Sequence, residues 1–382
     1  MGPLSSTMVH SIMIKGGYVF FASLGLISIA ACSSKNSIVA DAGTTTGNCS
    51  SPPPVEDTDL KACQGCTPTA SCEPSTPLEG CCTWVAEPNK PLARASTLHR
   101  YSGSGGVDVS CLSSPGMLGT SKNVTLTGYV WLFSSGQDSK GIKVEVFKET
   151  NPNTDGAIDP TPIGSYTTSA TDAAYPGDTL WNSKCNAPGC SFRQYTIPNV
   201  PTETPLVIKT SDAAGAGAWA TLYDYNIYFA NSKLGVGSDG GAPVANYDAT
   251  AAAADDLNTV AVTVGQTIQS TAGLLAGEIH DCGDVRVSGA TVGLTVQPAQ
   301  GGIFYFTSDE GNPLPDQTAH STSILGLFGG VNFPTGQPIR VTAMGEDPTD
   351  STKFMMLGSY VVQAYPGAVT AISLRGRRPW QP

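Results

Sequence analysis

Alternation of apolar and polar side chains begins at Asn123 and predicts β-strands. In the segment 124–132, VTLTGYVWL, the even positions are apolar and the odd positions are mostly polar or amphipathic. After a run of turn residues, Ile142, Val144 and Val146 alternate with charged neighbours. A period of two places successive side chains on opposite faces of a half-buried strand. We expect further strands at 163–169, 192–197, 206–210 and 222–229. Short strands between Gly and Pro turns are typical of a β-sandwich.

A second block of alternation begins near Asn258 and repeats the first. The segment 274–279 matches 126–130, with Gly277 in the place of Gly128, at an offset of 149 residues. The segment 289–294 matches 141–146 at an offset of 148 residues. Offsets that agree this closely indicate an internal repeat.

The closing strand of each block follows an Asn-x-Pro turn, at 199–201 and at 332–334. The apolar segments after these turns are 206–209 and 339–342. The offset between the two turns falls to 133 residues, so the first copy carries an insertion. We place it in the loops around 150–162 and 170–190, where a long loop is either functional or disordered.

These motifs resemble the carboxypeptidase regulatory-like domain, a transthyretin-like (prealbumin-like) β-sandwich. The shared pattern is a strand with Gly, a short turn, a Gly-x-x-Val-x-Val strand and an Asn-x-Pro turn before a closing strand. The resemblance implies two tandem all-β sandwiches that are noncatalytic and act as spacers, stabilisers or binding modules. It also implies a strand at 322–328, before the second turn, and the first copy is interrupted at that place.

The N-terminal segment predicts export. Lys15 precedes an apolar run of 16 residues, Gly16–Ala31, which is shorter than the ~20 residues that a membrane-crossing helix needs. A positive charge, a short apolar region and small residues before a cut are the features of a secretory signal. The ending at 29–32, IAAC, resembles the lipobox of bacterial lipoproteins, which implies that Cys32 carries the lipid. An uncleaved anchor and an ordinary signal with a chance cysteine are the alternatives.

We therefore expect five parts along the chain. Residues 33–100 are rich in Pro, Ser, Thr and Gly and show no sustained periodicity. The expected parts are a lipoprotein signal peptide at 1–31, a flexible Cys-rich tether at 32–100, a first β-sandwich at 101–231, a linker at 232–257 and a second β-sandwich at 258–378.

The 11 cysteines fit an oxidising compartment, and ten can pair if Cys32 carries lipid. Six disulfide candidates crowd the tether, and their connectivity stays open: Cys49, Cys63, Cys66, Cys72, Cys81 and Cys82. Cys185 and Cys190 flank a turn-forming Asn-Ala-Pro-Gly and are predicted to close a small loop. Cys111 and Cys282 remain as a long-range pair.

Composition argues against nucleic acid and anionic lipid head groups as partners. The net charge is -11, only 13% of residues are charged, and the chain has 43 Gly and 28 Pro. Binding of polyanions needs clustered Lys and Arg. The basic cluster of Arg375, Arg377 and Arg378 near the C-terminus is expected to be a solvated end.

No motif predicts a metal site, a cofactor or catalysis. Asn151, Asn153 and Asp155 have the spacing of a calcium loop, but Pro162 stands where the bidentate Glu belongs, so a solvated turn is favoured. His280 is two residues from Cys282, and we expect it to be a surface histidine. A pocket with two or more convergent titratable side chains would favour an undetected enzyme.

Aromatic side chains of the first block are the candidate ligand site. They are Trp131, Trp219, Tyr223 and Tyr225, with Trp181 nearby. Alternation places Tyr223 and Tyr225 on one face of a strand, as a sugar-stacking surface would require. Core packing or loop anchoring is the alternative.

We expect an exported lipoprotein, held in the cell envelope by its N-terminal lipid and facing the periplasm or the surface, with the outer membrane as the expected location. Its sandwiches would serve surface display, adhesion or assembly, with a surface protein or a glycan as partner. A carbohydrate- or ligand-binding module and a secreted enzyme are the alternatives.

Lipidation gives the first prediction. Metabolic labelling with a palmitate analogue should mark the wild-type chain and should be lost in Cys32→Ala, because that substitution removes the acylated thiol. Equal labelling of the two chains would refute the lipoprotein assignment.

Overall fold

Strands provide most of the regular structure in the part of the chain that the computed structural model describes. This part is residues 97–381 without 102–105, 134–136, 177–184, 186–188, 237–241, 297, 300–301, 310–312 and 348–349. Within it, the helices are α1 (Ser110–Ser113), α2 (Ala254–Thr263) and the 3-10 helix η1 (Asn231–Lys233). None of these has the length and apolar character that a membrane span requires. The expected all-β class is confirmed as a mostly β structure with several mixed sheets.

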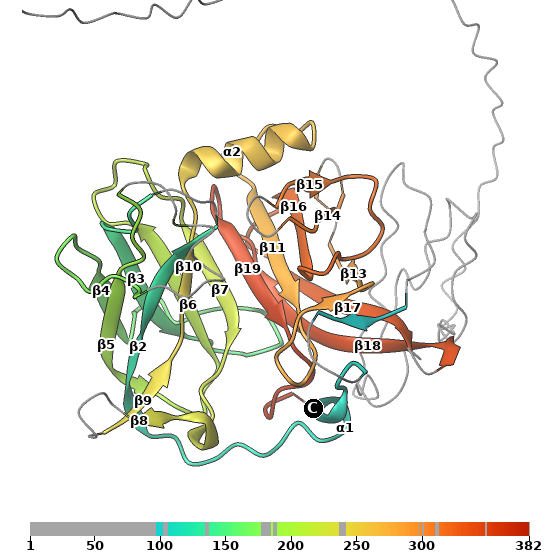
Figure 1. Ribbon diagram of the computed structural model, residues 1–382, viewed down its shortest axis with the longest axis horizontal. Helices are drawn as coiled ribbons and strands as arrows, with labels where there is room; N and C mark the ends of the chain where they lie inside the picture. The colour runs from blue at the N-terminus through green and yellow to red at the C-terminus, as the bar shows by residue number, and fades with distance from the viewer. Residues whose placement is uncertain are drawn as a thin grey trace, which may run out of the picture. The chain divides into compact units, whose positions relative to one another are not determined.

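The largest sheet runs through both sequence blocks (Figure 1). Its order is β15-β14-β16-β11-β19-β7-β6-β3-β4. The strands are β3 (Ile142–Lys148), β4 (Gly164–Thr167), β6 (Leu206–Asp212), β7 (Leu222–Ile227), β11 (Gly273–Ile279), β14 (Phe304–Phe306), β15 (Pro315–Asp316), β16 (Leu327–Phe333) and β19 (Val369–Leu374). The strand that joins the blocks is β19, because it pairs in parallel with β7 on one side and with β11 on the other.

Smaller sheets complete the described structure. In one of them β2 pairs antiparallel with β5 and parallel with β9 and β10, while β8 pairs with β9. These strands are β2 (Asn123–Leu132), β5 (Gln194–Pro201), β8 (Gly235–Val236), β9 (Pro243–Asn246) and β10 (Ala249–Ala251). Another has the order β13-β17-β18, with β13 (Thr291–Leu294), β17 (Pro338–Asp347) and β18 (Asp350–Gln363). The last pairs β1 (His99–Arg100) with β12 (Val287–Ser288).

Strand register confirms the internal repeat. Gly128 of β2 lies opposite Tyr195, and Gly277 of β11 lies opposite Phe328. Each pairing then slips by one residue, between Val124 and Leu126 in one copy and between Gly273 and Leu275 in the other. The slips leave Asn199 and Asn332 with φ of 60° and 65°. Asn tolerates this left-handed conformation, so the expected Asn-x-Pro turns are in fact β-bulges in β5 and β16.

A second equivalence lies in the turn before the Gly-x-x-Val-x-Val strand. The N–H of Gly141 donates to the carbonyl of Thr168 at 2.8 Å, and that of Ile142 donates to the Thr168 hydroxyl at 3.0 Å. In the second copy, Gly289 donates to the Thr322 carbonyl at 2.9 Å and Ala290 donates to the Thr322 hydroxyl at 3.0 Å. Threonine was not part of the sequence motif, yet it closes both turns.

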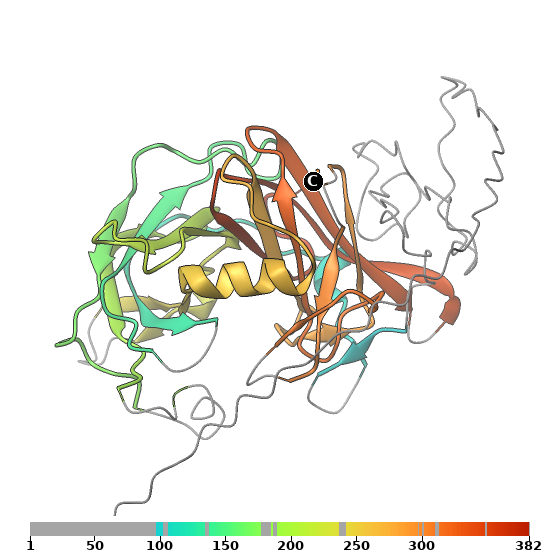
Figure 2. The ribbon, with the colours of Figure 1, turned by 90° about the horizontal axis from the view of Figure 1, so that it is seen from above.

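One hydrophobic core lies within the first copy, and a second lies mainly in the second copy but also takes in Phe147, Val207 and Tyr225 of the first. The first joins side chains of β2, β5 and β9 to those of β3 and β6. The second joins β11, β16 and β19 to β13, β17 and β18. A third apolar cluster forms where α2 packs on β7, β11 and β19. Figure 2, seen from above, shows α2 running from the strands of the first block (green) to those of the second block (orange).

Most expected strands are present, and two expectations are wrong. Residues 322–326 form no strand, because β16 begins only at Leu327, after Gly326 with φ of 67°. The segment 232–257 contains β8, β9, β10 and the start of α2 instead of an irregular linker. The pairing of β9 and β10 with β2 is the physical reason, because it satisfies backbone groups that a linker would leave to water.

The described start of the chain belongs with the second core. Leu98 packs in that core, and β1 pairs with β12. The predicted disulfide between Cys111 and Cys282 is present, and it ties this segment to the turn after β11. The predicted local bridge between Cys185 and Cys190 is also present. The signal peptide, Cys32 and the six clustered cysteines lie outside the described residues.

The close approach of strands at Gly277 gives a stability prediction. A Cβ there would lie 2.3 Å from the Ile372 carbonyl oxygen and 2.5 Å from a ring carbon of Phe328. Gly277→Ala should therefore lower the free energy of unfolding by about 1–3 kcal/mol, the usual cost of overpacking. Urea denaturation measures it, with Gly106→Ala as the control because nothing lies within 4 Å of that Cβ position. Equal stability of the two variants would contradict the close packing of β11 against Ile372 and Phe328.

Candidate functional site

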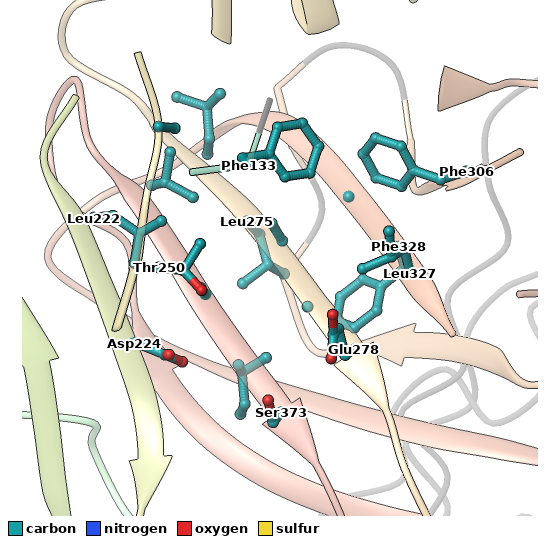
Figure 3. Close-up of a pocket in the computed structure, with 18 of the residues that line it drawn as sticks. Phe133, Leu222, Asp224, Thr250, Leu275, Glu278, Phe306, Leu327, Phe328 and Ser373 are labelled. Carbon is teal, nitrogen blue, oxygen red and sulfur yellow. The ribbon is translucent and has the colours of Figure 1, made fainter. Parts of the chain in front are cut away.

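A cavity of about 360 Å³ opens on the strands that join the two copies, β7, β19 and β11 (Figure 3). Its volume falls in the range of ~300–1,000 Å³ typical of small-molecule sites. The three strands are parallel neighbours, so side chains two residues apart on each strand point to the same face. The cavity therefore has a floor that the strand register defines.

The floor changes from apolar to polar along the strands. A first row is apolar, a second row combines a carboxylate with two small side chains, and a third row is polar. In the order β7, β19, β11, the rows are Leu222, Val369 and Leu274, then Asp224, Ala371 and Ala276, then Ser373 and Glu278 from β19 and β11. The two alanines leave the space that larger side chains would fill.

The apolar end is closed by aromatic and aliphatic side chains. Phe133, just after β2, meets Phe306 of β14 edge to face, with ring centroids 5.9 Å apart. Leu257 and Val260 of α2 line the same end. Figure 3 shows Phe133 and Phe306 at one end, with Asp224, Ser373 and Glu278 at the other. The cavity can thus hold an apolar group while a polar group reaches the charged side chains.

Asp224 is the buried carboxylate of the polar end. The residue is 7% exposed, and the Tyr247 hydroxyl donates a hydrogen bond to its Oδ2. Tyr195 in turn donates from its hydroxyl to the Tyr247 carbonyl oxygen at 2.7 Å. Burial raises the pKa of Asp224 to about 6, although the Tyr247 hydrogen bond and the charge of Arg375 oppose that rise. Asp224 therefore gains its charge near neutral pH, inside a cavity.

Glu278 belongs to an ion-pair network at the same end. His280 Nε2 lies 2.8 Å from its Oε2, and an Arg286 guanidinium nitrogen lies 3.1 Å from its Oε1. His280 Nδ1 lies 2.8 Å from Asp284 Oδ1, which also pairs with Arg375 at 2.7 Å. Both oxygens of Glu278 are thus engaged. The expectation that His280 is a surface histidine is wrong, because only 11% of its side chain is exposed between the two carboxylates.

These contacts shift the ionisation of the whole network. Burial favours the neutral form of each group, but the hydrogen bonds and charges outweigh it. The His280 hydrogen bond and the charge of Arg286 lower the pKa of Glu278 to about 2. The His280 hydrogen bond lowers the pKa of Asp284 to about 2. The bonds to Asp284 and Glu278 raise the pKa of His280.

The C-terminal arginines are not a solvated end. Arg375 lines the cavity and pairs with Asp284. Arg378 donates to the side-chain oxygen of Asn226 at 2.8 Å and to its carbonyl oxygen at 2.9 Å. Asn226 directly follows the part of β7 that pairs with β19, so these hydrogen bonds hold the C-terminal segment against the joining strands.

The predicted aromatic residues do not form one platform. Tyr225 is fully buried and donates its hydroxyl hydrogen bond to the Gly156 carbonyl oxygen at 2.7 Å. Tyr223 shares its strand face, as predicted, but its ring stacks on Tyr365 at 4.0 Å. Trp131 is 9% exposed and packs with Phe192, although it borders the cavity. Trp219 packs partly buried against the first core, and Trp181 lies outside the described residues.

The loop with calcium-like spacing is docked on the second copy rather than solvated. Asn151 donates its amide hydrogen bond to Asp155 at 2.8 Å. Arg340 of β17 donates to the Asn153 side chain and carbonyl oxygens, each at 3.3 Å, and Gln363 donates to the Asp155 carbonyl oxygen at 2.9 Å. Within the described residues, no group of three or more His, Cys, Asp or Glu side chains is arranged to hold a metal ion.

Sequence reasoning missed the residues that define the cavity. Asp224 lies between the two tyrosines that were singled out, so the same alternation places it on the opposite face of β7. Glu278 directly follows the repeated Gly277. Neither position showed that β19 would bring the two strands together, because that pairing joins residues far apart in the chain.

Comparison with known proteins leaves the family open. No family model matches the chain, and no curated protein matches it. Among solved structures, the chain is weakly similar to a mutant of the major pilin from Streptococcus pyogenes. The identity is 13%, the match covers 66% of this chain and 98% of that chain, and the TM-score is 0.15. A superposition this poor supports no conclusion about fold or function.

The network around His280 predicts a pH-dependent stability. The stabilisation that His280 adds is complete at pH values below the pKa that it has in the unfolded chain. It is lost as pH rises through the higher pKa that His280 has in the folded protein. Glu278 and Asp284 add stability at pH values above the pKa that each has in the unfolded chain. This stabilisation is lost as pH falls toward about 2, the pKa of both groups in the folded protein. His280→Gln should therefore cost about 1–3 kcal/mol of unfolding free energy at pH 5.5 and clearly less at pH 8.5.

Urea denaturation of wild type and variant at both pH values checks this. Subtracting the unfolding free energy of the variant from that of the wild type at each pH cancels the contribution of groups that titrate elsewhere in the chain. His99→Gln is the control, since His99 is exposed. A cost for His280→Gln that is equal or larger at pH 8.5 would contradict the network.

Proposed function

We propose that this chain is an exported, lipid-anchored binding protein of the cell envelope that holds a small ligand where its two copies join. The observation that carries the proposal is the cavity on β7, β19 and β11, with an apolar end and a charged end. Concave, mostly apolar sites with a few placed polar groups are the usual form of ligand sites.

Export and anchoring are supported by chemistry at two places. Disulfides such as Cys111–Cys282 and Cys185–Cys190 form and persist in oxidising compartments. The signal with its lipobox-like ending favours a lipid on Cys32, with the outer membrane as the proposed location. A tether over 32–96 would hold the β-rich part away from the bilayer.

The two copies are proposed to be transthyretin-like sandwiches of the carboxypeptidase regulatory-like kind. In support, one core joins β2, β5 and β9 to β3 and β6 of the nine-stranded sheet, and another joins β11, β16 and β19 of that sheet to β13, β17 and β18. In each copy, the first strand has an antiparallel partner, β5 for β2 and β16 for β11, and parallel pairing besides, β2 with β9 and β10 and β11 with β19. Such modules suit display or assembly at a surface, and here they also build the cavity.

Binding is favoured over catalysis by the way the carboxylates are engaged. Asp224 and Glu278 both border the cavity, which is the arrangement that would suggest an enzyme. Both oxygens of Glu278 are already bonded to Arg286 and His280. Asp224 accepts the Tyr247 hydroxyl. These bonds fix the carboxylates as positioned charges, so we propose no reaction.

The neutral apolar dye N-phenyl-1-naphthylamine tests the proposal. It should fluoresce on binding the wild-type chain, and Ala371→Trp should weaken binding at least ~10-fold, because the ring fills the space above the floor. Ala214→Trp is the matched control, since Ala214 lies exposed in a loop. Circular dichroism and thermal unfolding confirm that both variants fold. No binding to the wild type, or equal binding to both variants, would refute the site.

A further inference from the structure

We infer that the cavity selects small amphiphiles with a cationic group, such as a protonated amine, at one end of an apolar chain or ring, and that Asp224 recognises the cation. This inference rests on the proposed binding function and adds the class of ligand. It is carried by the geometry of the floor and by the way charges pair around it.

The charges at the polar end leave one buried carboxylate without a cationic partner in contact. Arg286 pairs with Glu278, and Arg375 pairs with Asp284. Within the described residues, no basic side chain lies within ion-pair distance of Asp224, and its hydrogen-bond partner is the neutral hydroxyl of Tyr247. A buried charge without a partner is costly. A cationic ligand group would supply the missing partner.

The position of Asp224 matches the head of a molecule that lies along the strands. It stands in the second row of the floor, beside Ala371 and one row from the apolar contacts of Leu222 and Val369. A cation at Asp224 therefore continues into an apolar tail that runs over the two alanines toward Phe133 and Phe306 (Figure 3). Because the floor changes from apolar to polar along the strands, the cavity excludes a ligand that is charged along its whole length.

Other charged groups near Asp224 change the strength of the preference for a cationic ligand but do not reverse it. Titratable and charged groups surround Asp224 or its neighbours on several elements. They are Tyr195 of β5, Tyr247 and Asp248 after β9, Glu278 of β11, His280, Asp284 and Arg286 after β11, and Arg375 and Arg378 after β19. The three cations His280, Arg286 and Arg375 are held by Glu278 and Asp284. Asp224 and the exposed Asp248 remain as the acidic pair on the cavity wall.

Recognition by Asp224 also implies that the affinity for an amine ligand depends on pH. The carboxyl is neutral below about pH 6 because burial raises its pKa, whereas an alkyl amine stays protonated to about pH 10. Binding of the amine should therefore strengthen as pH rises from 5 to 7.5. Binding of a neutral alcohol of the same length should not change.

Displacement of bound N-phenyl-1-naphthylamine tests the inference, with decylamine and decanoate used below their micelle concentrations and decanol below its solubility limit. We expect decylamine to compete about tenfold better than decanol at pH 7.5 and decanoate to compete worst. Asp224→Asn keeps the shape and an acceptor for Tyr247, and it should bring decylamine within about threefold of decanol when each competition is scaled to the dye affinity of the same variant. Asp255→Asn is the control, an exposed aspartate of α2 that does not line the cavity.

The outcomes distinguish a wrong ligand class from a failure of the proposed binding function. If the dye binds but the three compounds compete equally, or if Asp224→Asn keeps the amine preference, the inferred ligand class is wrong while the binding function stands. If decanoate competes best, Arg375 or Arg286 recognises the ligand and the inference is overturned. If the dye does not bind the wild type, the proposed function fails together with the inference.

Discussion

The parallel pairing of β19 with β7 is the interaction on which the described structure depends. The side chains of β19 pack in the second core, which also takes in Phe147, Val207 and Tyr225 of the first copy, while one edge of β19 pairs with β7. An unpaired edge of a sheet would expose backbone donors and acceptors. The pairing satisfies them, and it makes one nine-stranded sheet out of strands from both copies. Asn226, which bonds Ser373 on one side and Arg378 on the other, adds side-chain contacts to this join.

The same pairing explains why charged residues gather there. Strands β7 and β11 have no direct pairing, and β19 between them brings Asp224 and Glu278 to one end of a common face. Gly277 permits the close approach of its neighbours, and the small side chains of Ala276 and Ala371 leave space above the floor. The cavity and its acidic end are therefore consequences of how the copies are joined, and neither copy contains the whole site.

Local patterns in the sequence predicted the strands of the first block and the repeat. Alternation located β2, β3, β6 and β7, and the repeated glycines and asparagines marked equivalent bulges and turns. The paired cysteines 111 and 282 were found by their number and the compartment they imply. Alternation failed for α2 and for β9 and β10, because alanine-rich segments with few large side chains have no clear period. It also placed Tyr223 and Tyr225 on one face correctly without showing that Tyr365 of the second copy covers them.

The sequence by itself determined which residues alternate, where the chain repeats and which face of each strand a side chain takes, because these properties depend on neighbours in the chain. Only the tertiary structure decided that β19 inserts between β7 and β11, that His280 is enclosed by Glu278 and Asp284, and that Asp224 faces a cavity. The physical reason is that parallel pairing joins β19 to strands that lie 147 and 95 residues earlier in the chain, and the free energy of those contacts exists only when the chain has folded.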